Sequence, residues 1–352
     1  MITKRSIAIM IASIALILAG TFTIKIYKGY WRPFSYSREW KNEGIVLKAK
    51  DYCNYMANPE IAELPNGTWI MYTHGWPRDN TSKNDIYAFS SPDGLNWKSA
   101  GMVIENASMP AAVKLPDGKI RLYFVRNTSE ANGVMSALSS DGLAFRVEEG
   151  HRFAIGGGAP KDIENFAPYY KVTNESGAQK IKHMAHLNIV ELKGGGYRIY
   201  FGEGGMKAQL GNGKPWDIAR IRSISSEDGL NWKLDPGVRI DVGEPPLQEM
   251  QRADSPSVVR IGDEYHMFFN ASFGVWEDIK PWKRWSWSGV YEAVSKNGLD
   301  FKIIDKRLVY GSDAAIIKTN EQLRMYTSVA WGQDVSGINC INIESWVKKL
   351  TK

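Results

Sequence analysis

The residues best suited to chemistry in this 352-residue chain include an unusual number of tryptophans. Trp76 follows a predicted strand, and four more tryptophans fall within twelve residues: Trp276, Trp282, Trp285 and Trp287. Aromatic faces stack on the apolar C–H faces of sugar rings, and such side chains are scarce in exposed loops without a reason. We therefore expect Trp76, Trp282 and Trp285 to contact a carbohydrate. Packing between sheets or a protein interface is the alternative.

Three carboxylates near predicted strand starts could take part in acid–base chemistry. Asp254 stands in Asp-Ser-Pro-Ser, and Asp313 stands in Asp-Ala-Ala-Ile. Glu60 lies two residues after Asn58, so it shares a strand face with that amide. We expect Asp254, Asp313 and Glu60 to be catalytic, and Arg252 to bind substrate beside them. The structural alternatives are that Asp254 caps a turn and that Asp313 initiates one.

Other polar residues carry weaker signals. Asp162, Glu164 and Glu203 could reach the mouth of the same site, although a solvated surface is the simpler interpretation. Histidines such as His74 and His186 are more often structural than catalytic, and we expect His186 to bind substrate together with the amide at residue 58. The sequence has no His, Cys and Asp cluster with the spacing of metal ligands, so we expect no metal and no cofactor.

A repeated hairpin indicates the elements that position these residues. Four segments share the pattern Ser-x-Asp/Asn-Gly-Leu-x-aromatic, at residues 91–97, 139–145, 226–232 and 295–301. Asp-Gly or Asn-Gly between apolar, β-rich runs is the strongest short-range hairpin signal. An alternating strand precedes each hairpin, and a fifth such strand, Leu323–Tyr326, has no hairpin after it. Each repeat is therefore predicted to form four antiparallel strands, as in a propeller blade.

The two ends of the chain are predicted to pair. The segment Trp40–Leu47 has the same pattern as Trp97–Ile104, which closes the first repeat, yet it belongs to no repeat of its own. We expect the stretch from Ser37 to Leu47 to complete the fifth repeat, beside a strand at Ile338–Glu344. This pairing closes a ring and removes exposed sheet edges.

The hairpins, together with the Tyr-Arg-x-Tyr strands and five repeats, resemble the five-bladed glycosidase superfamily of arabinanases, β-xylosidases, invertases and levansucrases. The resemblance covers about residues 35–350. It implies an all-β, five-bladed β-propeller of four-stranded antiparallel blades, with an axial pocket that handles carbohydrate. It also implies three carboxylates on innermost strands of different blades, which divide acid, base or nucleophile, and charge-stabilising work.

The sequence departs from that pattern at the innermost strands. The family's first-blade carboxylate directly precedes a proline, where this chain has Asn58, and an amide is neither a base nor a nucleophile. Counting fourteen residues back from the tyrosine of the second strand gives Met109 in the second blade and His186 in the third. Asp254 resembles the family's Glu-Gly-Pro acid motif, with Asp in place of Glu, and Asp313 occupies the position in the fifth blade.

Two functions are compatible with these residues. In the first, the protein is a glycoside hydrolase or transglycosidase with Asp254 as the proton donor. In the second, it is a catalytically inactive carbohydrate-binding or scaffold protein at the cell surface. A pair of carboxyl groups about 5–10 Å apart in the axial pocket favours the enzyme, and an isolated acid among aromatic and amide side chains favours the binding protein.

The amino terminus predicts a membrane anchor or a signal peptide. Residues Ser6–Ile24 are uncharged and mostly apolar, lie between basic flanks, and are close to the roughly 20 residues that cross a bilayer. The sequence around Gly20 lacks small residues at both positions that cleavage requires, which favours an anchor. We therefore divide the chain into an anchor, residues 1–32, and an extracytoplasmic propeller domain, residues 33–352. Cleavage of the leader would make the domain secreted.

The composition excludes several other classes of protein. It is 43% hydrophobic and 23% charged, which is ordinary for a globular chain. Residues 1–32 hold five basic residues and no acidic one, which leaves 39 basic against 38 acidic residues in the domain. So neutral a domain argues against nucleic-acid binding, and we expect a monomer. Its two cysteines, Cys53 and Cys340, flank the predicted closure, either as a disulfide or as buried thiols.

Overall fold

The computed structural model describes residues 39–48, 51–52, 55–76, 84–127, 132–154, 171–173, 183–209, 215–247, 250–273, 288–309, 311–319, 322–333 and 339–349. All of these residues belong to one compact unit, Ser37–Lys352. The predicted anchor and Cys53 lie outside the described residues, as does the side chain of Cys340. Within the described ranges, no helix is long and apolar enough to cross a membrane.

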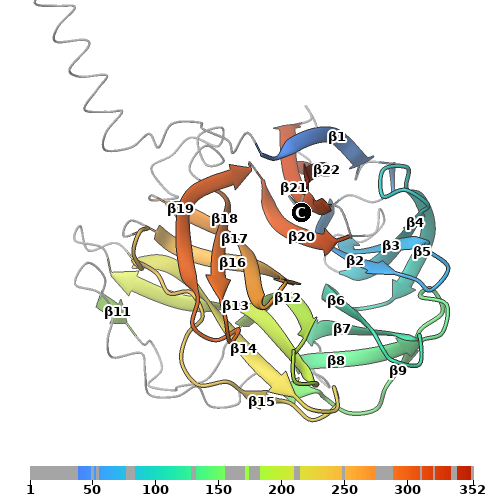
Figure 1. Ribbon diagram of the computed structural model, residues 1–352, viewed down its shortest axis with the longest axis horizontal. Helices are drawn as coiled ribbons and strands as arrows, with labels where there is room; N and C mark the ends of the chain where they lie inside the picture. The colour runs from blue at the N-terminus through green and yellow to red at the C-terminus, as the bar shows by residue number, and fades with distance from the viewer. Residues whose placement is uncertain are drawn as a thin grey trace, which may run out of the picture. The chain divides into compact units, whose positions relative to one another are not determined.

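Antiparallel strands build the described part of the chain, which contains no α-helix (Figure 1). The all-β prediction is therefore confirmed. The described strands form five successive antiparallel meanders. A parallel pair, Ala219 and Arg252, links the third meander to the fourth.

The five meanders follow the chain. Meander 1 contains β2 (Tyr55–Glu63), β3 (Trp69–Trp76), β4 (Asp85–Ser91) and β5 (Lys98–Ile104), and meander 2 contains β6 (Ser108–Lys114), β7 (Ile120–Asn127) and β8 (Asn132–Ser139), with β9 (Arg146–Val147) and β10 (Phe153–Ala154) paired to β8. Meander 3 contains β12 (His183–Glu191), β13 (Tyr197–Gln209), β14 (Pro215–Ser226) and β15 (Lys233–Leu234), with β11 (Lys171–Thr173) paired to β13. Meander 4 contains β16 (Met250–Ile261), β17 (Glu264–Phe273), β18 (Ser288–Ser295) and β19 (Lys302–Val309), and meander 5 contains β20 (Ser312–Lys318), β21 (Gln322–Gln333), β22 (Asn339–Lys349) and β1 (Lys41–Lys48).

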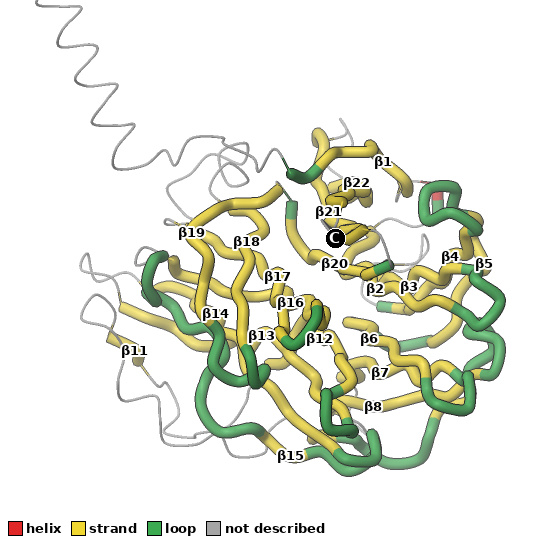
Figure 2. The backbone as a smooth tube through the Cα atoms, in the orientation of Figure 1, coloured by secondary structure: helices red, strands yellow, loops and turns green. Residues whose placement is uncertain are grey.

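The first strands of the five meanders contact one another in sequence. β2 contacts β6, β6 contacts β12, β12 contacts β16, β16 contacts β20, and β20 contacts β2. These contacts close a ring, which can be followed around the centre of Figure 2. Within a meander, burial decreases from the first strands to the last. β2 and β3 are buried on both faces, whereas β5 and β1 are largely exposed.

The N-terminal strand completes the last meander, as the sequence pattern predicts. β1 pairs with β22 in antiparallel register, from Lys41 opposite Val347 to Lys48 opposite Asn342. Beside this strand, Trp40 is buried and its ring meets the ring of Phe268 edge to face at 5.9 Å. The pairing satisfies the backbone groups that an open edge would leave exposed.

The repeated hairpin also joins four of the five meanders to the one before it in the ring. A tyrosine hydroxyl from the second strand of one meander donates a hydrogen bond to the hairpin glycine carbonyl of the next, in the pairs Tyr72–Gly142 (2.8 Å), Tyr123–Gly229 (2.7 Å), Tyr200–Gly298 (2.8 Å) and Tyr326–Gly94 (2.8 Å). The same tyrosine ring packs edge to face on the hairpin's aromatic residue, for example Tyr123 on Trp232 at 5.4 Å. The Tyr-Arg-x-Tyr and Asp-Gly motifs therefore recur together because each completes the other.

The fourth meander is informative because it lacks this hydroxyl. Its second strand carries Phe268 where the others carry tyrosine, and the fifth repeat that follows has no Asp-Gly hairpin in its sequence. Phe268 meets Trp40 instead, so the aromatic contact is kept while the hydrogen bond is lost.

Removing one of these hydroxyls should destabilise the fold. Tyr72→Phe leaves the Gly142 carbonyl without its buried donor, and we expect the free energy of unfolding to fall by about 1–2 kcal/mol in a denaturant titration. The reverse change, Phe268→Tyr, buries a hydroxyl that has no hairpin carbonyl to meet, so we expect it to be destabilising too. A stabilised Phe268→Tyr would contradict this account of the motif.

Candidate functional site

Each innermost strand contains a bulge at the same place. Five non-glycine residues there adopt left-handed backbone conformations with φ between 51° and 56°: Asn58, Met109, His186, Ser255 and Asp313. The pairing of each first strand with its second strand shifts register at this point. Such conformations cost about 1–3 kcal/mol each and persist only where the surroundings impose them. Their repetition marks a ring of structurally equivalent positions.

The equivalence differs in one detail from the expectation based on sequence. The structure aligns Ser255, not Asp254, with Asn58 and His186, because the bulge lies thirteen residues before Phe268 rather than fourteen. Asp254 lies one residue earlier on the strand. It nevertheless reaches the same cluster, as its contacts show.

Four of the five equivalent residues meet in one hydrogen-bonded network, although they come from four meanders. The amide of Asn58 contacts His186 Nδ1, and His186 Nδ1 lies 3.1 Å from Asp313 Oδ1. The hydroxyl of Ser255 donates to that same Asp313 oxygen at 2.8 Å. Met109 stands apart and packs against an apolar cluster. The axis therefore carries one polar network, which we call the axial network.

Asp254 joins the axial network through a neighbouring hydroxyl and is held by two nitrogen donors. Ser255 Oγ lies 3.4 Å from Asp254 Oδ1, Arg252 Nη2 donates to Asp254 Oδ2 at 3.0 Å, and Asn270 Nδ2 donates to Oδ1 at 3.0 Å. Space for the carboxylate depends on Gly202, where a Cβ atom would lie 3.3 Å from Asp254 Cβ. The structure thus brings together Asp254, Asp313, His186, Asn58 and Arg252.

The charges in the axial network are strongly coupled. Burial raises the pKa of Asp313, but the opposing effects of His186 and of hydroxyl donors including Ser255 prevail and lower it to about 2. Burial lowers the pKa of His186, whereas Asp313 and then Asp254 raise it, so that the net pKa lies above its ordinary value. Burial and the nearby His186 lower the pKa of His74 to about 4. At neutral pH, Asp313 is an anion and His74 is uncharged.

An aromatic pair lies next to the axial network. Tyr55, three residues before Asn58 on β2, stacks on Trp76 of β3 with ring centroids 4.7 Å apart and 29° between the planes. Trp76 is 36% exposed, which is high for so large an apolar side chain. Burial and the Asp313 charge raise the pKa of Tyr55, so its hydroxyl stays protonated. The pair offers a flat apolar surface of the kind that sugar rings contact.

Glu60 is part of a different layer. Its carboxyl group accepts a hydrogen bond from the backbone N–H of Ala112 at 3.4 Å and one from Asn188 Nδ2 at 3.5 Å. Asn188 in turn accepts from the N–H of Val258 at 2.8 Å. Burial raises the pKa of Glu60 to about 8. Glu60 therefore ties three innermost strands together as a neutral acid, and no described contact joins it to Asp254 or Asp313.

The remaining sequence candidates do not gather at this network. Glu203 is buried in an ion pair with Arg220, whose Nε lies 2.8 Å from Glu203 Oε2, so it is neither surface nor mouth. Asp162 and Glu164 lie outside the described residues, together with Trp282 and Trp285. Among the residues that the structure describes, no group of three or more His, Cys, Asp or Glu could hold a metal ion.

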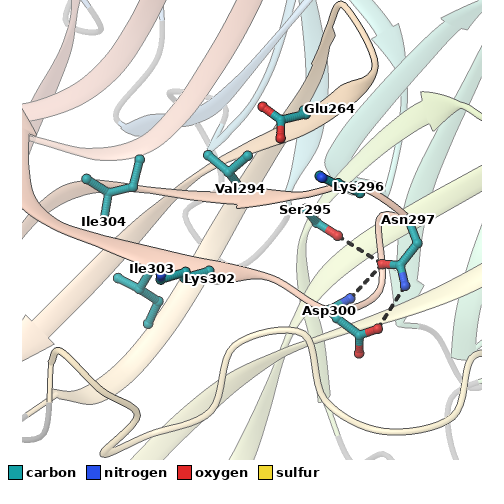
Figure 3. Close-up of a pocket in the computed structure, with 9 residues that line it drawn as sticks. All are labelled: Glu264, Val294, Ser295, Lys296, Asn297, Asp300, Lys302, Ile303 and Ile304. Carbon is teal, nitrogen blue, oxygen red and sulfur yellow. Dashed lines mark hydrogen bonds between the residues drawn. The ribbon is translucent and has the colours of Figure 1, made fainter.

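A hollow of about 660 Å³ lies elsewhere, on the β18–β19 hairpin (Figure 3). Three of its polar side chains bond to one another: Ser295 Oγ donates to Asn297 Oδ1 at 3.0 Å, and Asn297 Nδ2 donates to Asp300 at 2.8 Å. None of the sequence-predicted site residues lines it. We attribute this hollow to the turn itself, because its Ser295, Asn297 and Asp300 side chains bond to one another.

Sequence reasoning missed several members of the site. Ser255 carries no signal beyond its place before Pro256, yet it bridges the two aspartates. Asn270 and Tyr55 belong to none of the motifs that predicted the site. The available signal for Tyr55 was its position on the same strand as Asn58, three residues upstream. Nothing in the spacing of Asn270 indicated that it would face Asp254.

Comparisons with solved structures identify the fold. A thermostable family-43 glycoside hydrolase aligns with a TM-score of 0.56 at 12% identity, over 84% of this chain and 90% of that chain. An α-L-arabinofuranosidase from Clostridium thermocellum aligns with a TM-score of 0.51 at 14% identity, over 82% and 89%. A mutant of the Bombyx mori GH32 β-fructofuranosidase BmSUC1 in complex with sucrose aligns with a TM-score of 0.57 at 13% identity, over 90% and 64%.

These neighbours are glycoside hydrolases of families 43 and 32, which are five-bladed β-propeller enzymes. The resemblance predicted from the repeated motifs is therefore confirmed at the level of the fold. At such low identity, the likeness shows the fold alone. No protein-family model and no curated protein matches the sequence.

Proposed function

We propose that this protein is a glycoside hydrolase or transglycosidase that acts on an extracytoplasmic oligo- or polysaccharide through the axial network. In this proposal, the five meanders are the five blades of a propeller, and an N-terminal helix precedes them. The solved structures that share its fold belong to glycoside hydrolases, and one of them holds sucrose. Fold alone does not determine function, so the proposal depends on the chemistry of the site.

The observation that carries the proposal is a pair of carboxylates bridged by one hydroxyl. Ser255 Oγ lies 2.8 Å from Asp313 Oδ1 and 3.4 Å from Asp254 Oδ1. The two oxygens are separated by no more than the sum of these distances, which is shorter than the roughly 6.5–9.5 Å between the carboxyl groups of inverting glycosidases. The two carboxylates are therefore close enough to act on one glycosidic bond, as the carboxyl pairs of glycosidases do.

The aromatic pair of Tyr55 and Trp76 supports a sugar ligand beside these carboxylates. Arg252, whose side chain is 30% exposed, is suited to hydrogen bonding with sugar hydroxyls while it neutralises Asp254. Anchoring by residues 1–32, an extracytoplasmic location and a monomeric state belong to the same proposal. They rest on the sequence.

A second candidate is a carbohydrate-binding protein without catalysis. The observation that favours it is the identity of two equivalent residues in the ring, Asn58 and Met109, which cannot act as acid, base or nucleophile. The aromatic pair would serve this function equally well.

The test uses the full-length chain in mild detergent with arabino-, xylo-, fructo- and manno-oligosaccharides, read by mass spectrometry. We expect shortened or transferred products from the wild type and a loss of at least about 10²-fold in their rate with Asp254→Asn. Asp263→Asn is the matched control, because Asp263 is exposed on the β16–β17 turn. Sugar binding without any product would contradict the proposed glycosidase activity and favour the carbohydrate-binding function.

A further inference from the structure

The contacts and exposure of His186 are those of a histidine that is oriented for acid–base chemistry. Its Nδ1 atom lies 3.1 Å from Asp313 Oδ1 and also contacts the amide of Asn58, which must present its oxygen to the ring when Nδ1 carries a proton. With Nδ1 engaged, Nε2 is the ring nitrogen left to meet a ligand. The side chain is 21% exposed, more than that of Asp313 at 11% or Asp254 at 9%. Of these three titratable side chains, His186 is the one that solvent and ligand reach most readily.

Asp313 is arranged to orient His186 rather than to transfer protons. It accepts hydrogen bonds from Ser255 at 2.8 Å and from Ser312 at 3.2 Å, in addition to its contact with the imidazole. Such donors hold a carboxylate in its anionic form. Asp254 is engaged by Arg252 and Asn270, so its two oxygens are also occupied by donors.

We propose that His186, oriented by Asp313, is the proton donor of the axial site, in place of a protonated carboxylic acid. The inference rests on the proposed function and names its acid. His186 Nε2–H gives its proton to the glycosidic oxygen as the bond from that oxygen to the anomeric carbon breaks. The leaving sugar departs as an alcohol. Water then adds its oxygen to the anomeric carbon and returns its other proton to Nε2, so that protons and bonds balance.

Charged groups face His186 from three other strands, and together they favour the imidazolium. Asp313 on β20 and Asp254 on β16 are anions that stabilise its charge, Arg252 on β16 opposes them, and His74 on β3 interacts with it as a neutral ring. The two anions prevail, because burial and Arg252 do not bring the pKa of His186 below its ordinary value. His186 therefore holds the proton needed for donation to a higher pH than an ordinary histidine does.

The decisive variant is His186→Asn. Asparagine tolerates left-handed φ better than most residues, as Asn58 at the equivalent position illustrates, and its amide can still donate to Asp313. The change removes Nε2 with the rest of the titratable ring, while it keeps a nitrogen donor for Asp313. His266→Asn is the matched control, because His266 also pairs with a carboxylate, Glu292 at 2.7 Å, but lies on β17 outside the axial network.

The full-length variants are assayed on two kinds of substrate. The first is an arabino-, xylo- or manno-oligosaccharide, and the second is the 2,4-dinitrophenyl glycoside of the same sugar, whose leaving group departs without a proton. We expect His186→Asn to lower kcat/KM for the oligosaccharide by about 10²–10⁴-fold. The same variant should lower it less than about tenfold for the dinitrophenyl glycoside. Thermal unfolding verifies that the variant folds.

Each other outcome decides the question. If Asp254→Asn shows this dependence on the leaving group and His186→Asn does not, Asp254 is the acid and the inference is overturned while the proposed function stands. Equal losses on both substrates with His186→Asn overturn it too. If the wild type cleaves neither substrate, the proposed function itself is wrong, and the proton donor with it.

Discussion

Asp313→Asn is expected to move the basic limb of the pH profile of kcat/KM to lower pH and to reduce its maximum by at least about 10²-fold. The physical reason is the balance of effects on His186. Burial alone lowers the pKa of this histidine, and Asp313 is the largest effect that raises it. Without this anion, less opposes the effect of burial, and the imidazole loses its proton at a lower pH. The measurement is kcat/KM between pH 4 and 9 on the oligosaccharide that the wild type cleaves.

The same variant should change the stability of the protein in acid. A carboxylate whose pKa is lowered from about 3.8 to about 2 contributes stability above its unfolded pKa, and this contribution is lost as the pH falls through about 2. The contribution is about 2 kcal/mol for such a shift. Asp313→Asn lacks it, so its free energy of unfolding should fall less steeply than that of the wild type between pH 4 and pH 2.

The carboxamide that replaces the Asp313 carboxylate in this variant is neutral and close to it in shape, so misfolding is a small risk. His266→Asn again serves as the control for the pH profile. An unchanged basic limb in Asp313→Asn would show that this carboxylate does not set the protonation of His186. It would leave Asp313 as a structural anchor for Ser255 and Ser312.

Much of the fold was predictable because its determinants are local. The Asp-Gly hairpins are specified within seven residues, and the Asp93 carboxylate shows why: it accepts from the N–H groups of Leu95 and Asn96 at 2.9 and 2.8 Å. The pairing of β1 with β22 was also predictable, since Trp40 repeats the pattern of Trp97 without a hairpin of its own. Because the segment at Trp40 repeats the segment at Trp97, its strand partner can be inferred by comparing the two, although that partner is far away in the sequence.

The site was less predictable because its contacts join distant residues at irregular backbone. Asn58 and His186 are 128 positions apart, and no spacing rule relates them. The bulge in β16 lies one residue closer to the second strand than the bulge in β2 does. Counting along the sequence therefore paired Asp254 with Asn58, whereas Ser255 is the equivalent residue in the structure. Glu60 was placed on the strand face of Asn58, but the left-handed conformation of Asn58 breaks the alternation on which that expectation relied.

The layer that contains Glu60 leads to the prediction with the largest effect on stability. Burial raises the pKa of Glu60 from about 4.5 to about 8, since its hydrogen bonds from Ala112 and Asn188 are long and compensate little. Between these two values, the folded protein keeps a proton that the unfolded chain releases. Stability therefore declines as the pH rises through this range, by up to about 5 kcal/mol at pH values above 8.

Glu60→Gln removes this penalty while it keeps the shape of the side chain and the acceptor for Ala112. We expect the variant to match the wild type within about 1 kcal/mol at pH 5 and to exceed it increasingly up to pH 9, when free energies of unfolding are measured by denaturant titration. Glu227→Gln on an exposed hairpin should show no such divergence. A variant that gains no stability over the wild type between pH 5 and pH 9 would mean that Glu60 ionises without cost, and then it would be a third axial carboxylate. A neutral Glu60 instead confines the negative charge at the axis to Asp254 and Asp313, the two carboxylates that face His186.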